Sequence, residues 1–311
     1  YSHPGVLTAS IYRTNPRNKG LLSRLGFGCM RFARDDREVK KQIAYAIEYG
    51  VNYFDTAYAY PNNEERLGKA LAALGYRGKV FIATKMPTYL ISKPDDFDKM
   101  FQTQLKRLQT DYIDYYLMHM LSNVGEWETV CNLSILGFIN EKKKKGQIRN
   151  IGFSYHGGLQ EFKDLIDVYD WDFCMIQFNY LDENNQAGKS GLDYAASKGL
   201  PVMIMEPLRG GKLVNKLPKE AMKVWDNAPV KRSPAEWALR WVWNHPAVVT
   251  VLSGMNSMEM IEENIRIASE AKAEELTPAD LALYDQVRKI ILGKETVPCT
   301  GCGYCMPCPR G

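Results

Sequence analysis

Four side chains in the first half of the chain could together deliver a proton to a carbonyl oxygen. Asp55, Lys85 and His119 each end an apolar run of strand length, and Tyr60 follows Asp55 by five residues. A tyrosine phenol has an ordinary pKa of about 10, and a neighbouring ammonium group lowers it by stabilising the phenolate. Lys85 could supply that ammonium group with Asp55 as its counter-ion. The set predicts a proton donor for reduction of a C=O group, with the hydride coming from a bound cofactor because no side chain supplies one.

Each of these residues also has a plain structural explanation. An Asp or Lys at the end of a strand can cap a turn or face water, and a His after an apolar run can be an ordinary core residue. The functional interpretation therefore depends on a fold that brings several strand ends around one pocket.

The apolar pattern predicts such a fold. Eight runs of strand length alternate with segments of helical period, at residues 25–30, 51–56, 79–85, 112–119, 148–154, 173–178, 201–206 and 247–253. The runs are mostly continuously apolar, as in parallel strands that are buried on both faces. This α/β pattern predicts a single (β/α)₈ TIM barrel, whose active site lies at the carboxyl ends of the strands. A doubly wound open sheet is the alternative, but "LGFGCMRF" does not fit the glycine-rich dinucleotide fingerprint.

The segments between the strands carry helix signals. Asp35 and Glu38 have the spacing of a capping box, and Ser233 and Thr277 each precede a proline at the first position of a predicted helix. An apolar stripe with helical spacing indicates a further helix, and its members are Phe97, Phe101, Leu105 and Leu108.

Three of these runs resemble the aldo-keto reductase family. The motifs are "YFDTAYAY", "ATK" and "LMH", and the similarity extends from about residue 20 to residue 292. The resemblance implies a (β/α)₈ barrel, a nicotinamide cofactor and reversible reduction of aldehydes or ketones, which are small-molecule carbonyl substrates. It also implies roles for the tetrad: Tyr60 is the general acid, Lys85 tunes its pKa, Asp55 holds Lys85, and His119 orients the carbonyl. Tyr58 is the other tyrosine of the motif, but its spacing from Asp55 does not match the family.

The resemblance also implies a set of cofactor-binding positions: Gly28, Met30, Asp55, Ser154, Gln177, Met205, Glu206, Leu208, Arg209, Gly210, Gly211, Gly254 and Asn264. Gln177 and Ser154 match residues that bind the nicotinamide amide, although Tyr155 stands where the family has an asparagine. Met205 stands where an aromatic residue often packs on the nicotinamide ring. The segment from Glu206 to Gly211 matches the loop that covers the pyrophosphate. A plain βα turn is the alternative interpretation of that loop.

The choice between NADPH and NADH is less clear in the sequence. A 2′-phosphate needs cationic partners, and no Lys or Arg occurs between Ser253 and Asn264. Either Arg209 or Lys212 supplies that charge, or the enzyme accepts NADH; the resemblance favours NADP. Residues just past the strand ends are candidates for the substrate pocket, and they are Met30, Arg31, Met86, Tyr89 and Tyr155.

The last residues of the chain contain a separate motif. Cys299, Cys302, Cys305 and Cys308 follow one another at intervals of three residues, which resembles the cysteine run of a [4Fe–4S] ferredoxin. The last interval is one residue short, and no second cysteine group follows in this chain. Zinc is the alternative, although structural zinc sites usually separate two CxxC pairs by a loop. We therefore expect a barrel domain at 1–292 and a cysteine-rich tail, part of a ferredoxin-like extension, at 293–311.

Composition narrows the class of protein. The net charge of +4, from 40 basic and 36 acidic residues, does not suggest a nucleic-acid partner, and the run from Lys142 to Lys145 is expected to be a solvated helix end. No apolar stretch approaches the roughly 20 residues of a membrane span. Cys29, Cys131 and Cys174 are scattered, which favours a reducing, cytoplasmic location.

Two other functions remain open at this stage. A barrel of this kind could bind a nicotinamide cofactor as a regulatory or scaffold protein with little turnover. An iron–sulfur cluster in the tail could instead make the protein an electron-transfer module. The sequence favours no particular oligomeric state.

Overall fold

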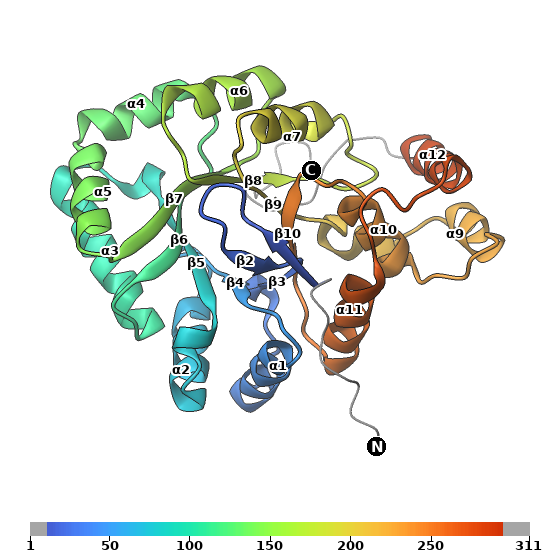
Figure 1. The fold of residues 1–311 in the computed structure, drawn as a ribbon, viewed down its shortest axis with the longest axis horizontal. Coiled ribbons are helices and arrows are strands. Elements are labelled where there is room, and N and C mark those ends of the chain that lie inside the picture. Colours follow the sequence, from blue (N-terminus) through green and yellow to red (C-terminus); the bar gives the residue numbers. More distant parts are fainter. Residues whose placement is uncertain (1–10, 295–311) are drawn as a thin grey trace.

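The computed structural model describes residues 11–294. Eight parallel strands close into a barrel in the order β10-β3-β4-β5-β6-β7-β8-β9 (Figure 1). Their bounds are β3 (Leu25–Gly28), β4 (Tyr53–Asp55), β5 (Phe81–Pro87), β6 (Ile113–His119), β7 (Ile148–Tyr155), β8 (Phe173–Gln177), β9 (Val202–Met205) and β10 (Val248–Ser253). Each strand lies within one of the predicted apolar runs or extends at most two residues past it. The predicted (β/α)₈ TIM barrel is confirmed, and the doubly wound sheet is excluded.

Helices surround the barrel on its outside (Figure 1). Their bounds are α1 (Asp36–Glu48), α2 (Asn63–Leu74), α3 (Pro94–Leu108), α4 (Val124–Asn132), α5 (Ile135–Lys144), α6 (Leu159–Val168), α7 (Gly188–Ser197), α8 (Lys212–Asn215), α9 (Lys219–Asp226), α10 (Pro234–Trp243), α11 (Met258–Glu270) and α12 (Pro278–Leu292). The predicted stripe on α3 is buried in full. No helix of the described residues is long and apolar enough to cross a membrane.

The three predicted helix N-caps are present, but one of them lacks the second half of its predicted capping box. Ser233 caps α10, and Thr277 caps α12 in a complete capping box with Asp280. Asp35 caps α1 by accepting from the backbone N–H groups of Arg37 and Glu38. The Glu38 carboxylate accepts a hydrogen bond from Gln42 at 3.4 Å, one helical turn onward, so the predicted box is a single cap.

A hairpin precedes the barrel and was not predicted. Strands β1 (Tyr12–Thr14) and β2 (Leu21–Ser23) pair antiparallel, and three residues each are too few to give a period-two pattern. Leu22 is fully buried and packs in the same cluster as residues from the barrel interior. Arg13 donates to the carbonyl oxygens of Trp243, at 2.7 Å, and Val248, which fixes the hairpin to the start of β10. The hairpin therefore closes the end of the barrel opposite the carboxyl ends of the strands.

The core has two shells. The outer shell lies between strands and helices, and the inner shell fills the barrel with side chains such as Tyr53, Tyr115, Phe173 and Met203. Successive side chains of a strand point to opposite faces. Every second residue therefore enters the barrel, and the interior is closed by packing before the polar residues at the carboxyl ends are reached.

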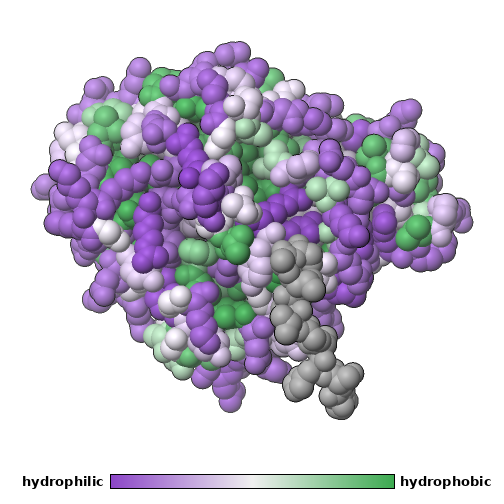
Figure 2. Space-filling view, viewed as in Figure 1, coloured by the Kyte–Doolittle hydropathy of each residue, from purple (hydrophilic) through white to green (hydrophobic). Residues whose placement is uncertain are grey.

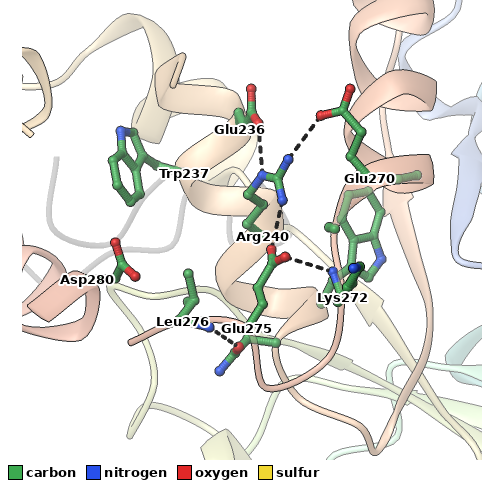
Figure 3. Close-up of polar contacts among 12 residues, drawn as sticks. Glu236, Trp237, Arg240, Glu270, Lys272, Glu275, Leu276 and Asp280 are labelled. Carbon is green, nitrogen blue, oxygen red and sulfur yellow. Dashed lines mark hydrogen bonds and ion pairs between the residues drawn. The ribbon is translucent and has the colours of Figure 1, made fainter. Parts of the chain in front are cut away.

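A buried arginine joins the last three long helices (Figure 3). Arg240 of α10 donates to Glu236 at 2.8 Å, to Glu275 at 2.8 Å and to Glu270 of α11 at 3.1 Å. Only 9% of the Arg240 side chain is exposed. The cluster holds α11 against α10 and also holds the segment that leads into α12.

The surface in the view of Figure 2 is mostly hydrophilic, with small scattered apolar areas. The expectation of a solvated helix end at Lys142 to Lys145 is wrong for one of the four residues, since Lys144 and Lys145 are exposed at the end of α5. Lys142 is buried against α3, where its ammonium group lies 2.5 Å from Asp98, so it is not part of a solvated helix end. Gly146 does adopt the left-handed conformation after α5, at a φ of 69°.

Candidate active site

Five neighbouring strands carry a polar residue at an inward-facing position near their carboxyl ends. Counting by two along each strand leads from the apolar interior to Asp55 on β4, Lys85 on β5, His119 on β6, Ser154 on β7 and Gln177 on β8. All five side chains are buried. The barrel thus brings together residues that are far apart in the sequence, and it does so at the end where barrel active sites lie.

Lys85 and Asp55 form the ion pair of this ring. The Lys85 Nζ lies 2.5 Å from Asp55 Oδ1 and donates to the Thr56 carbonyl oxygen at 2.7 Å. The two side chains are 2% and 5% exposed. Burial raises the pKa of Asp55, and the charge of Lys85 opposes that rise. The pair is desolvated, so each member depends on the other for its charge.

Tyr60 lies above this pair in the turn between β4 and α2. The Lys85 Nζ is 5.1 Å from the centroid of the Tyr60 ring. The ring meets that of His119 edge-on, with centroids 6.2 Å apart and planes at 85°. Tyr58 lies elsewhere, because its ring packs under the Arg107 guanidinium of α3 at 4.5 Å. The structure therefore brings Tyr60, and not Tyr58, to the ring of polar side chains.

His119 is held neutral. Burial and, to a lesser extent, the positive charges of Lys85 and of a protonated His156 lower its pKa to about 3. A neutral imidazole can donate a hydrogen bond from one nitrogen and accept one at the other. His119 can therefore bind a carbonyl oxygen without carrying a charge of its own.

His156 is a second histidine near this site, and the sequence analysis missed it. It follows β7 two residues after Ser154, so the alternation of the strand places it on the same side. Burial lowers its pKa to about 4, against a hydrogen bond with Gln186. The period-two pattern of "FSYH" was the signal that could have found it.

Two candidates for the substrate pocket are wrong. Tyr155 and Met86 sit at outward positions of β7 and β5 and are fully buried in the outer shell. The Tyr155 hydroxyl donates to the Gly158 carbonyl oxygen at 2.6 Å. Met30 and Tyr89, which were also candidates, are 50% and 61% exposed.

A polar network behind β5 positions Lys85. Gln104 of α3 donates to the Lys85 carbonyl oxygen at 3.0 Å and to Glu64 at 2.8 Å. Glu64 also accepts from Thr84 at 2.6 Å, and the Tyr116 hydroxyl donates to Gln104 at 2.7 Å. These buried groups satisfy one another and fix the backbone that carries the lysine.

Gln177 is oriented by a second buried cluster. Its Nε2 donates to Asp182 at 2.7 Å, and Asp182 also pairs with Arg209 at 3.2 Å. The Gln177 Oε1 is buried and has no hydrogen-bond partner among the described residues. An acceptor in that position suits the amide N–H₂ of a nicotinamide ring, and Met205 lies at the inward end of β9 beside it.

The loop after β9 has an unusual backbone. Glu206, Arg209, Gly210 and Gly211 all have positive φ, at 55°, 49°, 64° and 89°. Burial and the charge of Asp182 raise the pKa of Glu206 to about 7, against the opposing charges of Arg209, Arg31 and Lys212. The paired glycines leave backbone uncovered by side chains, while the N–H groups of Arg209 and Gly211 donate to the carbonyl oxygens of Glu206 and Leu208 at 3.0 and 2.9 Å. Leu208, another predicted member of this loop, is half-buried.

The remaining predicted positions lie around β10. Asn264 of α11 is buried and donates to Ser253 at 3.0 Å, and Gly254 is exposed directly after the strand. Gly28 has a structural role, because a Cβ there would lie 3.2 Å from the Ser253 carbonyl oxygen of the neighbouring strand. The stretch from Ser253 to Asn264 forms the loop and first turns of α11.

The cysteine motif lies outside the described residues. Cys299, Cys302, Cys305 and Cys308 all follow residue 294. Within 11–294, no group of three or more His, Cys, Asp or Glu side chains could hold a metal ion. The iron–sulfur prediction therefore stays a prediction.

Curated proteins with assigned names are similar to this chain in sequence. An aldo-keto reductase of Mycolicibacterium vanbaalenii is 28% identical over 253 residues, which cover 79% of this chain and 83% of that protein. The methylglyoxal reductase YeaE of Escherichia coli is 26% identical over 286 residues, covering 88% and 93%.

Solved structures agree. The holo form of aldo-keto reductase AKR11C1 from Bacillus halodurans superposes with a TM-score of 0.74 at 26% identity, covering 89% of this chain and 95% of that one. An aldo-keto reductase from Klebsiella pneumoniae in complex with NADPH has the same fold, with a TM-score of 0.70 at 22% identity, and covers 88% and 93%. The model of the aldo/keto reductase family matches residues 24–289. The chain belongs to the aldo/keto reductase family of oxidoreductases.

Proposed function

We propose that this protein reduces the carbonyl group of a small aldehyde or ketone to an alcohol with NADPH, and that Tyr60 is the general acid. The observation that carries the proposal is the position of Lys85, whose ammonium group is next to both Asp55 and the Tyr60 ring. A buried cation beside a phenol stabilises the phenolate that forms when the proton leaves.

The residues present fit a nicotinamide cofactor. The unpaired Gln177 Oε1 suits the ring amide, and the glycine-rich loop after β9 suits a pyrophosphate. Arg209 and Lys212 are cations close to that loop. In the Klebsiella protein of the same fold the cofactor is NADPH, and we extend this preference to the present chain. When bound, the cofactor supplies the hydride.

The side chains of the ring divide the remaining work. His119 donates a hydrogen bond that orients the carbonyl oxygen, and its low pKa keeps it from competing as a charged acid. Tyr60 gives its hydroxyl proton to that oxygen as negative charge develops. Lys85 stabilises the resulting phenolate, and Asp55 keeps Lys85 in place. Ser154 accepts from the Met120 N–H at 3.0 Å, which fixes the start of the loop after β6.

Turnover distinguishes this proposal from a regulatory or scaffold role. The purified chain is mixed with NADPH and a panel of aldehydes and ketones that includes methylglyoxal, the substrate in the name of one relative. Oxidation of NADPH that depends on the carbonyl compound is the expected result. Tight binding of NADPH without turnover on any carbonyl compound would favour the scaffold role instead.

We further propose that the tail at 293–311 is a cysteine-rich, ferredoxin-like [4Fe–4S] segment separate from the barrel at 1–292. The spacing of Cys299, Cys302, Cys305 and Cys308 supports this. Iron and acid-labile sulfide are measured in chain purified without oxygen, with a Cys299→Ser, Cys302→Ser variant and a Cys131→Ser control. Loss of iron and sulfide in the double variant alone is expected, whereas bound zinc would contradict the proposal. The free, isolated thiols of Cys29, Cys131 and Cys174 support a reducing, cytoplasmic location.

A further inference from the structure

Arg31 lies across the mouth of the barrel between two loops. It ends the short turn Cys29–Arg31 that directly follows β3, and β3 pairs with β10, which in turn pairs with β9. A Cβ on Gly254, after β10, would lie 3.3 Å from Arg31 Cβ and 3.1 Å from Arg31 Cδ. A Cβ on Gly210, in the loop after β9, would lie 3.3 Å from Arg31 Nη2. The stem of Arg31 therefore runs over one glycine and its guanidinium reaches the other.

These two glycines make room for the arginine. Side chains at either position would come closer to Arg31 than nine in ten real Cβ contacts. Because both positions lack side chains, the Arg31 side chain lies against bare backbone at each of them. The backbone N–H groups of Arg209 and Gly211 already donate within the loop, so the guanidinium itself is what this place offers to an anion.

The Arg31 guanidinium has no polar partner in the part of the chain that the structure describes. Arg31 is exposed and makes no hydrogen bond or ion pair with the residues at 11–294. The nearest acid is Glu206, whose pKa Arg31 lowers only as a lesser contributor. Arg209, by contrast, is buried and paired with Asp182. Among residues 11–294 nothing occupies the donors of Arg31, so they are available to a ligand.

We propose that Arg31 binds the pyrophosphate of the nicotinamide cofactor from the β3 side, next to the loop from Glu206 to Gly211. The inference rests on the proposed function. The fork of the guanidinium matches two phosphate oxygens at once. We favour the pyrophosphate over the 2′-phosphate as the group that Arg31 binds. Arg31 lies against Gly254 and Gly210, which lie in the loops after β10 and β9, whereas Asn264 and the rest of α11 come later in the chain, beyond Gly254.

The test measures cofactor affinity rather than activity. Dissociation constants of NADPH and of NADH are determined by titration calorimetry for the wild type, Arg31→Gln and Arg31→Lys. Arg37→Gln is the matched control, because the Arg37 side chain is 96% exposed on α1 and pairs only weakly with Asp35, at 3.6 Å. Thermal unfolding checks that the variants fold as the wild type does.

Arg31→Gln is expected to weaken both NADPH and NADH by the same factor, roughly ten- to a hundredfold, since a charge-assisted hydrogen bond is lost. Arg31→Lys should fall between, because a lysine keeps the charge but not the fork, and Arg37→Gln should bind as the wild type does. Unchanged affinity in Arg31→Gln would overturn the inference alone. A loss confined to NADPH would move Arg31 to the 2′-phosphate and also overturn it. If the wild type binds neither nucleotide, the proposed function fails as well.

Discussion

The Nζ of Lys85 lies 2.5 Å from Asp55 Oδ1 and 5.1 Å from the centroid of the Tyr60 ring. One buried cation therefore lies next to both an acid that it needs for its own charge and the phenol proposed as the proton donor. The acid–base chemistry proposed for this protein depends on that double contact.

Replacing Lys85 by Met should separate stability from catalysis. The change leaves the buried Asp55 without its counter-ion, so the free energy of unfolding should fall by about 3 kcal/mol, and carbonyl reduction should fall by at least roughly a hundredfold. Adding Asp55→Asn removes the unpaired carboxylate. Urea unfolding of the double variant should therefore recover part of the lost stability, while its single-turnover rate should stay low. Recovery of the rate would show that Lys85 acts only through Asp55.

The two neutral histidines should make the protein lose stability in acid. Burial lowers the pKa of His119 to about 3 and that of His156 to about 4, whereas an unfolded histidine has a pKa of about 6.5. As the pH falls, the unfolded state therefore takes up protons before the folded state does. The folded state keeps the full stabilisation from its neutral histidines above about pH 6.5 and loses it as the pH falls toward 4. At pH 5 each histidine should account for about 2 kcal/mol of lost unfolding free energy.

The check for the histidines is urea unfolding between pH 7 and pH 5. In a His119→Gln, His156→Gln variant, the free energy of unfolding should decline less steeply with falling pH than in the wild type. A His245→Gln variant serves as the comparison, because burial also lowers the pKa of His245. Equal slopes for the wild type and the double variant would show that carboxylates alone cause the decline.

Glu206 should make cofactor binding depend on pH. Its pKa is raised to about 7 by burial and by Asp182, against Arg209, Arg31 and Lys212. Above that pH a carboxylate faces the proposed pyrophosphate site and repels the cofactor, so affinity should fall severalfold between pH 6 and pH 8. NADH is the proper ligand, because the 2′-phosphate of NADPH has its own pKa of about 6. Calorimetry should find that Glu206→Gln binds NADH equally well across this range, and a retained slope would assign the dependence to another group.

The arginine cluster of Figure 3 should matter for stability rather than chemistry. Arg240→Ala leaves Glu236 without its closest buried partner, at 2.8 Å, and should lower the free energy of unfolding by about 3–5 kcal/mol. Arg266 pairs with the same glutamate at 2.7 Å but its side chain is 47% exposed. Arg266→Ala should therefore cost about 1 kcal/mol at most. Similar losses in the two variants would contradict the importance of burial.

The sequence predicted the barrel well because its strands are continuously apolar and end in polar residues. It also placed Asp55, Tyr60, Lys85 and His119 together, since neighbouring parallel strands bring their ends to one pocket. It did not separate inward from outward positions within an apolar run, so Tyr155 was assigned to the pocket and His156 was missed. The contact of Arg31 with Gly210 and Gly254 joins segments about two hundred residues apart, and no local pattern predicts such a contact.

The most direct test of the account is a comparison of Tyr60→Phe with Tyr58→Phe. Each change removes one hydroxyl from the same loop, but only Tyr60 lies beside Lys85 and His119. Single-turnover reduction of a reactive aldehyde is followed with NADPH bound, and NADPH affinity is measured alongside. The account predicts that Tyr60→Phe loses at least roughly a hundredfold in rate while binding NADPH normally, and that Tyr58→Phe stays close to the wild type. Equal rates in Tyr60→Phe and the wild type would contradict the assignment of Tyr60 as the general acid.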